Sequence, residues 1–374
     1  MKLHEYLAKE VFKEAGISIP KGIIIEDINE LDLALEQVKI PCVIKSQVLS
    51  GGRGKAGLVV FVDTVEKAKT EVNRLFNHEL NIKKLLIEEA VNIEKEIYVS
   101  ITVEPKLAKG LMLISLEGGI DIETLAVTNP EKIIKELIDL RYGLMPFQAS
   151  RIAYSLGLNQ DLTKKLIRLL LSLYSVFKKY DAELVEINPL FITKNQEIVA
   201  GDGKLMIDDN SMYRQNRFEK TEAEYKSEAE YEAALEGIPF IQFDGDIGLM
   251  CAGAGLTTTV YDLINYEGGT VANYLEFGGP NYKKAVKAME ICLKVPSKVI
   301  LIVTFGTIAR ADVMAEGIVD AIQRLKPDRP IVTCIRGTNE ALAVITLKAA
   351  GLEPIFDTEE AVRKAVSLAK GGTK

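Results

Sequence analysis

The 374-residue sequence predicts an α/β protein of two domains, the second built on a doubly wound, mostly parallel sheet. Three observations support this prediction. Short apolar strands and helical stretches alternate regularly after residue 247. A charged segment with few β-branched residues, 208–237, separates this region from the first half. The first half is organised around two apolar runs that flank a glycine-rich loop between Pro41 and Val62.

The composition is that of an ordinary globular protein, with 48% hydrophobic and 26% charged residues. A net charge of −7 disfavours a general nucleic-acid or membrane-surface role. No apolar run approaches the ~18 residues of a membrane span, and the N-terminus lacks a signal-peptide pattern. Four widely spaced cysteines in apolar segments favour a cytoplasmic protein with reduced thiols. With only His4 and His78 present, histidine chemistry must use one of these or another chain.

The stretch from Pro41 to Val62 combines glycines with positive charge. An apolar strand ends on Lys45, a polar loop follows, and a second strand begins at Leu58. Glycines allow backbone N–H groups to approach phosphate oxygens and donate hydrogen bonds to them. Nearby cations neutralise the negative charge of the phosphates. The loop glycines are Gly51, Gly52, Gly54 and Gly57, and the cations are Lys45, Arg53 and Lys55. We therefore predict a hairpin that binds a nucleoside triphosphate.

Other interpretations of this loop fit less well. The dinucleotide pattern G-x-G-x-x-G needs a helix next, but LVVFV is a strand. The P-loop pattern fails because Ala56 follows Lys55 and Leu49 stands where its first glycine belongs. A protein-kinase glycine loop fits locally, yet the H-R-D and D-F-G motifs occur nowhere in the sequence. A flexible hairpin tip would explain the glycines but not the cations among them.

Apolar spacing and capping residues predict the other elements of the first half. Asn129 followed by Pro130 predicts a helix that reaches about Leu140. An opening helix stops at Gly16, and its apolar stripe is Leu3, Leu7, Val11 and Ala15. The remaining expectations are helices at 29–39, begun by Asn29 with Asp32, at 65–76 and at 161–180, and strands at 84–90 and 96–104.

Glu88 and Glu96 lie in these apolar strands. Each acid must either pair with a positive charge or lie on a sheet face that is exposed to solvent. A sharper signal follows in LVEINPLFI and EIVAGDGK, which hold Glu186, Asn188 and Asp202. Hard oxygen ligands on adjacent strands suit Mg²⁺, which shares substrate phosphates. We expect Pro189 to end the pairing of its strand and leave Asn188 at an exposed rim, although an Asn-Pro turn can also be purely structural.

In the second half, small polar loops follow the predicted strands, at the edge where doubly wound sheets bind ligands. These loops are CAGAGLT, EFGGPN, FGTIAR and IRGTNE. Glycines that lead into a helix N-terminus, together with Arg310 and Arg336, predict a carboxylate or phosphate site, although tight packing turns could explain any single loop. The predicted strands are 247–251, 270–275, 299–304, 331–335 and 354–356, with helices beginning near Leu256, Tyr282, Ala311, Asn339 and Thr358.

Four motifs, LHEYLAKE, GGRGKAG, VEINPL and GAGL, carry a family resemblance. Along almost its full length the sequence closely resembles the β subunits of succinate–CoA ligases (succinyl-CoA synthetases). The resemblance implies an ATP-grasp domain at 1–215, a charged linker at 216–238 and a flavodoxin-like CoA-ligase domain at 239–374. It also implies an α-subunit partner that carries a phosphorylated histidine and binds CoA, in agreement with the scarcity of histidines here.

The resemblance further implies a role for each matching residue. Asn188 and Asp202 correspond to the Mg²⁺ ligands, and Glu186 to the carboxylate that assists phosphoryl transfer to the partner's histidine. In the implied reaction, phosphate moves from ATP to histidine and then to the acid, and CoA thiolate displaces it. The corresponding nucleotide contacts are Lys45, Gly52, Arg53, Gly54, Glu88, Val91 and Glu96.

The loops expected to bind the acid depart from the succinate–CoA ligase pattern and resemble those of ATP-citrate lyase and citryl-CoA synthetase. Arg336 places a guanidinium, which can bind two oxygens at once, where the succinate–CoA ligases have a carboxylate. Ala252 stands where they have an amide side chain, and so makes room for a larger acid. The whole chain thus implies succinate, while its loops favour citrate or another more highly charged acid. In the alternative, Arg336 pairs with an acid of the partner subunit. The acid- or phosphate-binding residues so predicted are Ala252, Gly253, Gly255, Thr307, Ile308, Ala309, Arg310 and Arg336.

Two other classes of function compete with this interpretation. A non-catalytic nucleotide-binding subunit would be expected to lose residues such as Lys45 and Glu186, which are intact. A carboxylate–amine ligase would share the nucleotide-binding half but would not need the doubly wound second domain.

Overall fold

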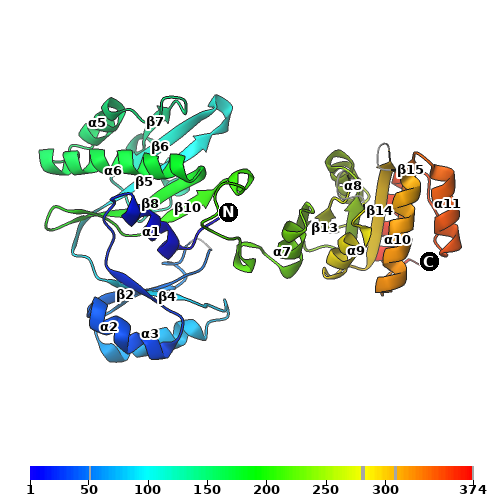
Figure 1. Cartoon of the computed structure of the whole chain (residues 1–374), viewed down its shortest axis with the longest axis horizontal. Helices are drawn as coiled ribbons and strands as arrows, with labels where there is room; N and C mark the ends of the chain where they lie inside the picture. The colour runs from blue at the N-terminus through cyan, green and yellow to red at the C-terminus, as the bar shows by residue number, and fades with distance from the viewer. Residues whose placement is uncertain (50–51, 279–282, 307–309, 373–374) are drawn as a thin grey trace. The chain divides into compact units, whose positions relative to one another are not determined.

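The computed structural model describes residues 1–49, 52–278, 283–306 and 310–372. They form two compact units, Met1–Lys220 and Thr221–Lys374, coloured blue to green and green to red in Figure 1. Among the described helices, none combines the length and apolar character that a membrane crossing requires. The division after Lys220 is set by contacts within each unit, and the domain boundaries at 215 and 238 stay predictions.

The N-terminal unit contains two antiparallel sheets. The smaller has the order β1-β4-β2-β3, and helices α2 and α3 pack against it (Figure 1). Every second residue at the start of β2 and β4 belongs to one buried apolar cluster, so one face of the sheet is buried beneath these helices. The elements are β1 (Gly22–Ile25), α2 (Leu31–Val38), β2 (Cys42–Ser46), β3 (Val59–Val62), α3 (Val65–Phe76) and β4 (Leu85–Glu89).

The larger sheet has the order β10-β8-β5-β6-β7, with β9 paired to β8. Helices α1, α5 and α6 pack against it and share its apolar core. Helix α6 follows the apolar spacing that predicted it, and Asn159 caps its N-terminus. The elements are α1 (Glu5–Glu14), β5 (Ile93–Glu104), β6 (Lys109–Ser115), α4 (Ile122–Thr128), β7 (Ile134–Ile138), α5 (Pro146–Ser155), α6 (Gln160–Lys179), β8 (Ala182–Thr193), β9 (Ile198–Ala200) and β10 (Lys204–Ile207).

The helix predicted from Asn129 to Leu140 is wrong. Asn129 makes no side-chain capping bond, and only a short 3-10 turn, Pro130–Lys132, follows it. The next residues form β7, which pairs with β6. Tertiary pairing decided this segment, because the apolar residues of Ile134–Ile138 do not alternate with polar ones and only the exposure of the side chains in the folded strand alternates.

The expectation that Pro189 ends its strand is also wrong. Strand β8 continues to Thr193 and stays paired with β5 on both sides of the proline. Between the Ile97–Leu190 and Val99–Ile187 pairs, one residue of β5 faces two of β8. Such a bulge accommodates a proline, which has no N–H to give to the ladder.

The capping residue predicted for helix α2 is wrong. Asp27, rather than Asn29, provides the capping side chain, and it caps a short 3-10 turn that leads into α2.

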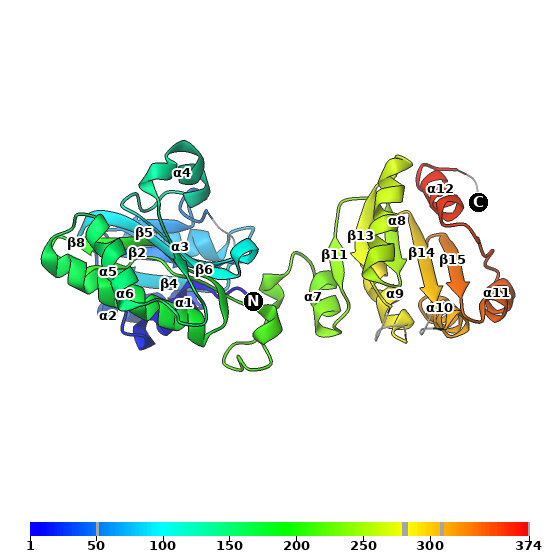
Figure 2. The ribbon, with the colours of Figure 1, turned by 90° about the horizontal axis from the view of Figure 1, so that it is seen from above.

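The C-terminal unit confirms the doubly wound prediction. Its sheet has the order β11-β13-β12-β14-β15, parallel except for β11 at one edge. Figure 2 shows α8 and α12 on one side of this sheet and α9 and α10 on the other. The elements are α7 (Glu228–Leu235), β11 (Phe240–Gln242), β12 (Ile247–Cys251), α8 (Ala254–Tyr266), β13 (Val271–Leu275), α9 (Ala285–Leu293), β14 (Val299–Gly306), α10 (Ala311–Leu325), β15 (Ile331–Gly337), α11 (Glu340–Ala349) and α12 (Thr358–Ala369).

The strand predicted at 354–356 is reduced to a single bridge between Thr333 and Pro354. Asp357 caps α12 directly afterwards, so the chain turns away from the sheet before a strand can form. Tyr282, where a helix start was predicted, lies outside the described residues. Helix α7 lies in the predicted linker but packs against α9 and β11.

Candidate functional site

A cleft of about 750 Å³ in the N-terminal unit is lined by residues of both its sheets. The small sheet contributes the glycine hairpin between β2 and β3, and the large sheet contributes β8 and the turn before β10. The structure thereby brings most of the predicted nucleotide and metal residues together. Those that line the cleft are Lys45, Gly52, Arg53, Gly54, Glu88, Val91, Glu186, Asn188 and Asp202.

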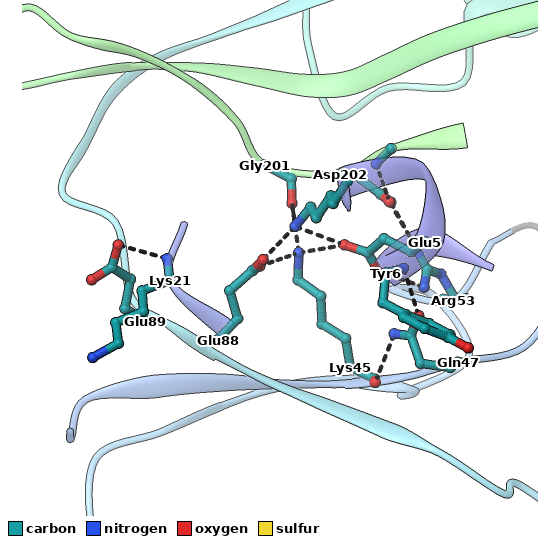
Figure 3. A network of polar contacts seen from close by, with 12 residues as sticks. Glu5, Tyr6, Lys21, Lys45, Gln47, Arg53, Glu88, Glu89, Gly201 and Asp202 are labelled. Carbon is teal, nitrogen blue, oxygen red and sulfur yellow. Dashed lines mark hydrogen bonds and ion pairs between the residues drawn. The ribbon is translucent and has the colours of Figure 1, made fainter. Parts of the chain in front are cut away.

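Two buried lysines meet at one set of acceptors in this cleft. The Lys45 ammonium lies 2.9 Å from Glu5 and 2.8 Å from Glu88, and donates to the Gly201 carbonyl at 2.5 Å (Figure 3). The Lys9 ammonium lies 2.9 Å from Glu5, 2.5 Å from Glu88 and 2.9 Å from the Gly201 carbonyl. All four charged residues are buried. We call these groups, with Arg53 and Asp202, the buried ion cluster.

Arg53 connects the glycine hairpin to this cluster. One guanidinium nitrogen lies 2.6 Å from a Glu5 carboxylate oxygen (Figure 3). The other terminal nitrogen donates to both carboxylate oxygens of Asp202, at 2.7 and 2.9 Å. Burial opposes the charge of Glu5, but Lys45, Lys9 and Arg53 hold its pKa well below its usual value. Burial likewise opposes the charge of Lys45, yet its two acids raise its pKa, so the ammonium stays protonated at neutral pH.

Strand β8 presents Glu186 to the cleft. Its backbone faces Ser100 on β5 and Lys204 on β10. The Tyr98 hydroxyl lies 2.9 Å from the Ser100 hydroxyl and 3.4 Å from a Glu186 carboxylate oxygen. Burial raises the pKa of Glu186, and the charge of Asp202 adds to this effect against the opposing charge of Lys204. A half-buried carboxylate beside a cleft can orient a reacting group or accept a proton from it.

Asn188 and Asp202 suit a magnesium ion that arrives with phosphates. The Asn188 side chain accepts from the Gly119 N–H at 2.8 Å and donates to the Ile120 carbonyl at 3.0 Å. Within the described part of the chain, no group of three or more histidines, cysteines or acids could hold a metal. One amide oxygen and one carboxylate fit Mg²⁺, which commonly combines few protein ligands with water and substrate phosphates.

Glu96 is the one predicted nucleotide residue that does not appear among the described residues lining this cleft. Its backbone carbonyl accepts from the Gly118 N–H at 3.1 Å. A side chain at Gly119 would place its Cβ 2.5 Å from a Glu96 carboxylate oxygen. Glu96 therefore lies against the 118–119 loop, which itself reaches the cleft at Gly119.

Glu5, Lys9 and Gly201 belong to the site, although their positions in the sequence did not predict it. The opening helix buries Ala8 and Phe12 completely, whereas Leu7 of its predicted stripe is only half-buried. The buried face of α1 is therefore rotated, and it includes Glu5 and Lys9, four residues apart. An acid and a base at this spacing on a helix that packs into a core form the signal that could have revealed them.

In the C-terminal unit, the described parts of the predicted loops meet at the carboxyl edge of the parallel strands. Gly253 begins α8 with a φ of +101°, a conformation that favours glycine. A Cβ at Gly278 would lie 2.7 Å from the Gly253 nitrogen, so the loops after β12 and β13 touch. Ala252 and Gly255 belong to the same segment. The predicted residues Thr307, Ile308 and Ala309 lie outside the described residues.

Both arginines of this edge have acidic neighbours within the chain. Arg310 pairs with Asp312, and Arg336 lies 2.7 Å from Glu340, also donating to the Phe356 carbonyl. The predicted gain of positive charge at Arg336 is therefore smaller than the sequence suggested, because Glu340 offsets it.

Comparisons with known proteins place these features in context. Two family models match, an ATP-grasp domain over residues 2–192 and a CoA-ligase over residues 250–368. The chain is 69% identical to the ADP-forming sulfoacetate–CoA ligase subunit SqwK of Acholeplasma sp, covering 99% of this chain and 92% of that one. It is 57% identical to subunit SauC of the same activity from Bilophila wadsworthia, over 99% and 100% of the two chains.

A more distant relative is the succinate–CoA ligase [ADP-forming] β subunit of Ignicoccus hospitalis, 40% identical over 99% of this chain and 100% of that one. Among solved structures, ATP citrate lyase from Methanothrix soehngenii, in complex with citrate and coenzyme A, matches with a TM-score of 0.75. It covers 99% of both chains at 21% identity, which shows a shared fold.

Proposed function

The chain belongs to the ADP-forming acid–CoA ligases as a β-type subunit, and from this premise we propose that it helps to activate sulfoacetate with ATP. The choice of acid rests on one observation: two sulfoacetate–CoA ligase subunits are considerably more similar to this chain than the succinate–CoA ligase β subunits are. Succinate is the second candidate, because those β subunits match over nearly the whole chain.

The chemistry of sulfoacetate suits the carboxyl edge of the C-terminal sheet. Its carboxylate is the group to be activated, and its sulfonate stays ionised and offers three oxygens to hydrogen-bond donors. The N-terminus of α8 at Gly253 and the guanidinium groups of Arg310 and Arg336 are donors of the required kind. Citrate, which the loop pattern favours, has weaker support because the relatives that are 69% and 57% identical to this chain are sulfoacetate–CoA ligase subunits.

We place the nucleotide in the cleft of the N-terminal unit. Lys45 and Arg53 would contact phosphate oxygens, and the backbone N–H groups of Gly52 and Gly54 would close on them. Asn188 and Asp202 would hold Mg²⁺, which when bound neutralises charge on the transferring phosphoryl group. Glu88, Val91 and Glu96 complete the proposed nucleotide contacts.

A partner subunit would supply the histidine. Neither His4 nor His78 is among the described residues lining the cleft. In the proposed sequence, the γ-phosphoryl group passes from ATP to the partner's histidine and then to the carboxylate of the acid. The CoA thiolate, held mainly by the partner, attacks the resulting acyl phosphate and releases phosphate. The four cysteines are free and buried, which is consistent with a reducing, cytoplasmic location.

A comparison of acids tests the choice of substrate. In the complex with its partner, kcat/KM for sulfoacetate should exceed that for succinate and citrate by about tenfold or more, because a site built for a polar group rejects analogues that leave it unpaired. Arg336→Gln should lower kcat/KM for sulfoacetate by about tenfold, because the variant loses one charge-assisted hydrogen bond to the acid.

Arg324→Gln is the matched control, since Arg324 is an exposed arginine of α10. A clear preference for succinate, unchanged in Arg336→Gln, would replace sulfoacetate by the second candidate.

Glu186→Gln tests the proposed carboxylate. Its charge should orient the partner's histidine, so phosphorylation of the partner should slow by about a hundredfold while the Kd for MgATP stays the same. Rapid-quench phosphorylation and calorimetry measure the two effects. Glu183→Gln, an exposed position on the same strand, is the control. Weaker nucleotide binding with normal phosphorylation would contradict the assigned role.

A further inference from the structure

The two lysines of the buried ion cluster differ in their access to the cleft. Lys45, Glu5, Glu88 and Gly201 all line it, whereas Lys9 is not among the described lining residues and is only 2% exposed. We propose that Lys9 is a positioning residue, which balances the two buried glutamates so that Lys45 can turn to the phosphates of a nucleotide. This inference rests on the proposed function of the cleft.

The donors of Lys45 are fully engaged in the structure. An ammonium has three N–H groups, and Lys45 meets Glu5, Glu88 and the Gly201 carbonyl, one acceptor for each. To contact a phosphate, it must release at least one of them. Lys9 reaches the same three acceptors from the buried side. Each acceptor therefore keeps a cation when Lys45 turns away.

Without Lys9, the balance of charge would change. Lys45 would be the single ammonium facing two buried carboxylates, and Arg53 would contact only one of them. Leaving a buried carboxylate without a counter-ion is strongly unfavourable. Nucleotide binding would then have to overcome this penalty, and the penalty would appear only for ligands whose phosphates compete for Lys45.

Lys9→Met in the full-length chain tests this inference, because methionine keeps much of the side-chain length without the charge. Calorimetry should show the Kd for MgATP rising at least about tenfold, while the Kd for AMP, which lacks the outer phosphates, changes less than about threefold. Lys13→Met, an exposed position one turn later on α1, is the matched control. Thermal melting of each variant checks that it folds.

The outcomes separate this inference from the proposed function. If wild-type chain does not bind MgATP, the proposed function fails. If wild type binds but Lys9→Met binds MgATP equally well, or loses MgATP and AMP affinity to the same extent, Lys9 has no positioning role. Adding Glu5→Gln to Lys9→Met restores the charge balance and should recover MgATP affinity at least about fivefold. A further loss in this double variant would also overturn the inference.

A measurement on the wild-type chain covers the case in which Lys9→Met does not fold. With lysine labelled by ¹⁵N at Nζ, two slowly exchanging ammonium signals are expected from the buried lysines. Saturating MgATP should shift one signal, that of Lys45, much more than the other. Equal shifts, or no shift in either signal, would contradict the proposed division between the two lysines.

Discussion

Purified alone, the chain should bind MgATP and yet form no acyl-CoA, and with its partner it should form the thioester at every turnover. His78 is half-buried, with its Nδ1 accepting from the Leu80 N–H at 3.2 Å. His4 is half-buried, and burial together with nearby cations such as Lys84 lowers its pKa. Neither side chain is among the described residues that line the cleft, so we expect neither to receive the γ-phosphoryl group there.

Radiolabelled ATP provides the measurement. With [γ-³²P]ATP, the isolated chain should carry no acid-labile label, and in the complex the label should appear on the partner subunit. A His4→Gln, His78→Gln double variant in the complex is the control, and its histidine phosphorylation should persist. Label on this chain, or acyl-CoA made by it alone, would refute the two-subunit mechanism.

Asp202→Ala should reduce Mg²⁺-dependent turnover by about a thousandfold, because a metal ion contributes several kcal/mol of charge stabilisation to phosphoryl transfer. The side chain of Asp202 is 35% exposed and lies in a turn, so the fold should survive the change. Steady-state kcat at saturating Mg²⁺ and ATP measures the effect. Asp161→Ala, which alters a side chain 85% exposed at the start of α6, should leave activity unchanged.

Asp202 also accepts hydrogen bonds from Arg53, so a second variant separates this role from that of a metal ligand. Asp202→Asn keeps an oxygen that can accept from Arg53 at this position but loses the charge that Mg²⁺ requires. We expect Asp202→Asn to be as inactive as Asp202→Ala. Near-normal turnover of either variant with Mg²⁺ would remove Asp202 from the proposed metal site.

Much of the fold could be predicted because local patterns and tertiary pairing agree. The alternation of apolar strands and helices after Ile247 is confirmed as a doubly wound sheet, since fully apolar strands can only be buried on both faces. The glycine hairpin is flanked by β2 and β3 as predicted, because its apolar runs are short and bounded by turn residues. Helices α3 and α6 lie where apolar periodicity placed them.

The errors arise where long-range contacts override a local signal. The residues after Pro130 have the beginning of a helix in their sequence, but the β6 edge pairs with them as β7. Pro189 would end an isolated strand, but β5 continues to pair across a bulge. Neither partner strand is close in sequence to the segment it controls, so no local pattern could reveal the outcome.

By itself the sequence determined which residues could bind phosphate and metal, because glycines, cations and hard oxygen ligands have this chemistry in any setting. Tertiary structure alone decided that Glu5 and Lys9 belong to the same site, since Glu88 and the Gly201 carbonyl reach them from distant segments. It also decided that Glu340 offsets Arg336. The physical reason is common to both cases: a buried charge must find a counter-charge, and only the folded chain shows which one lies within reach.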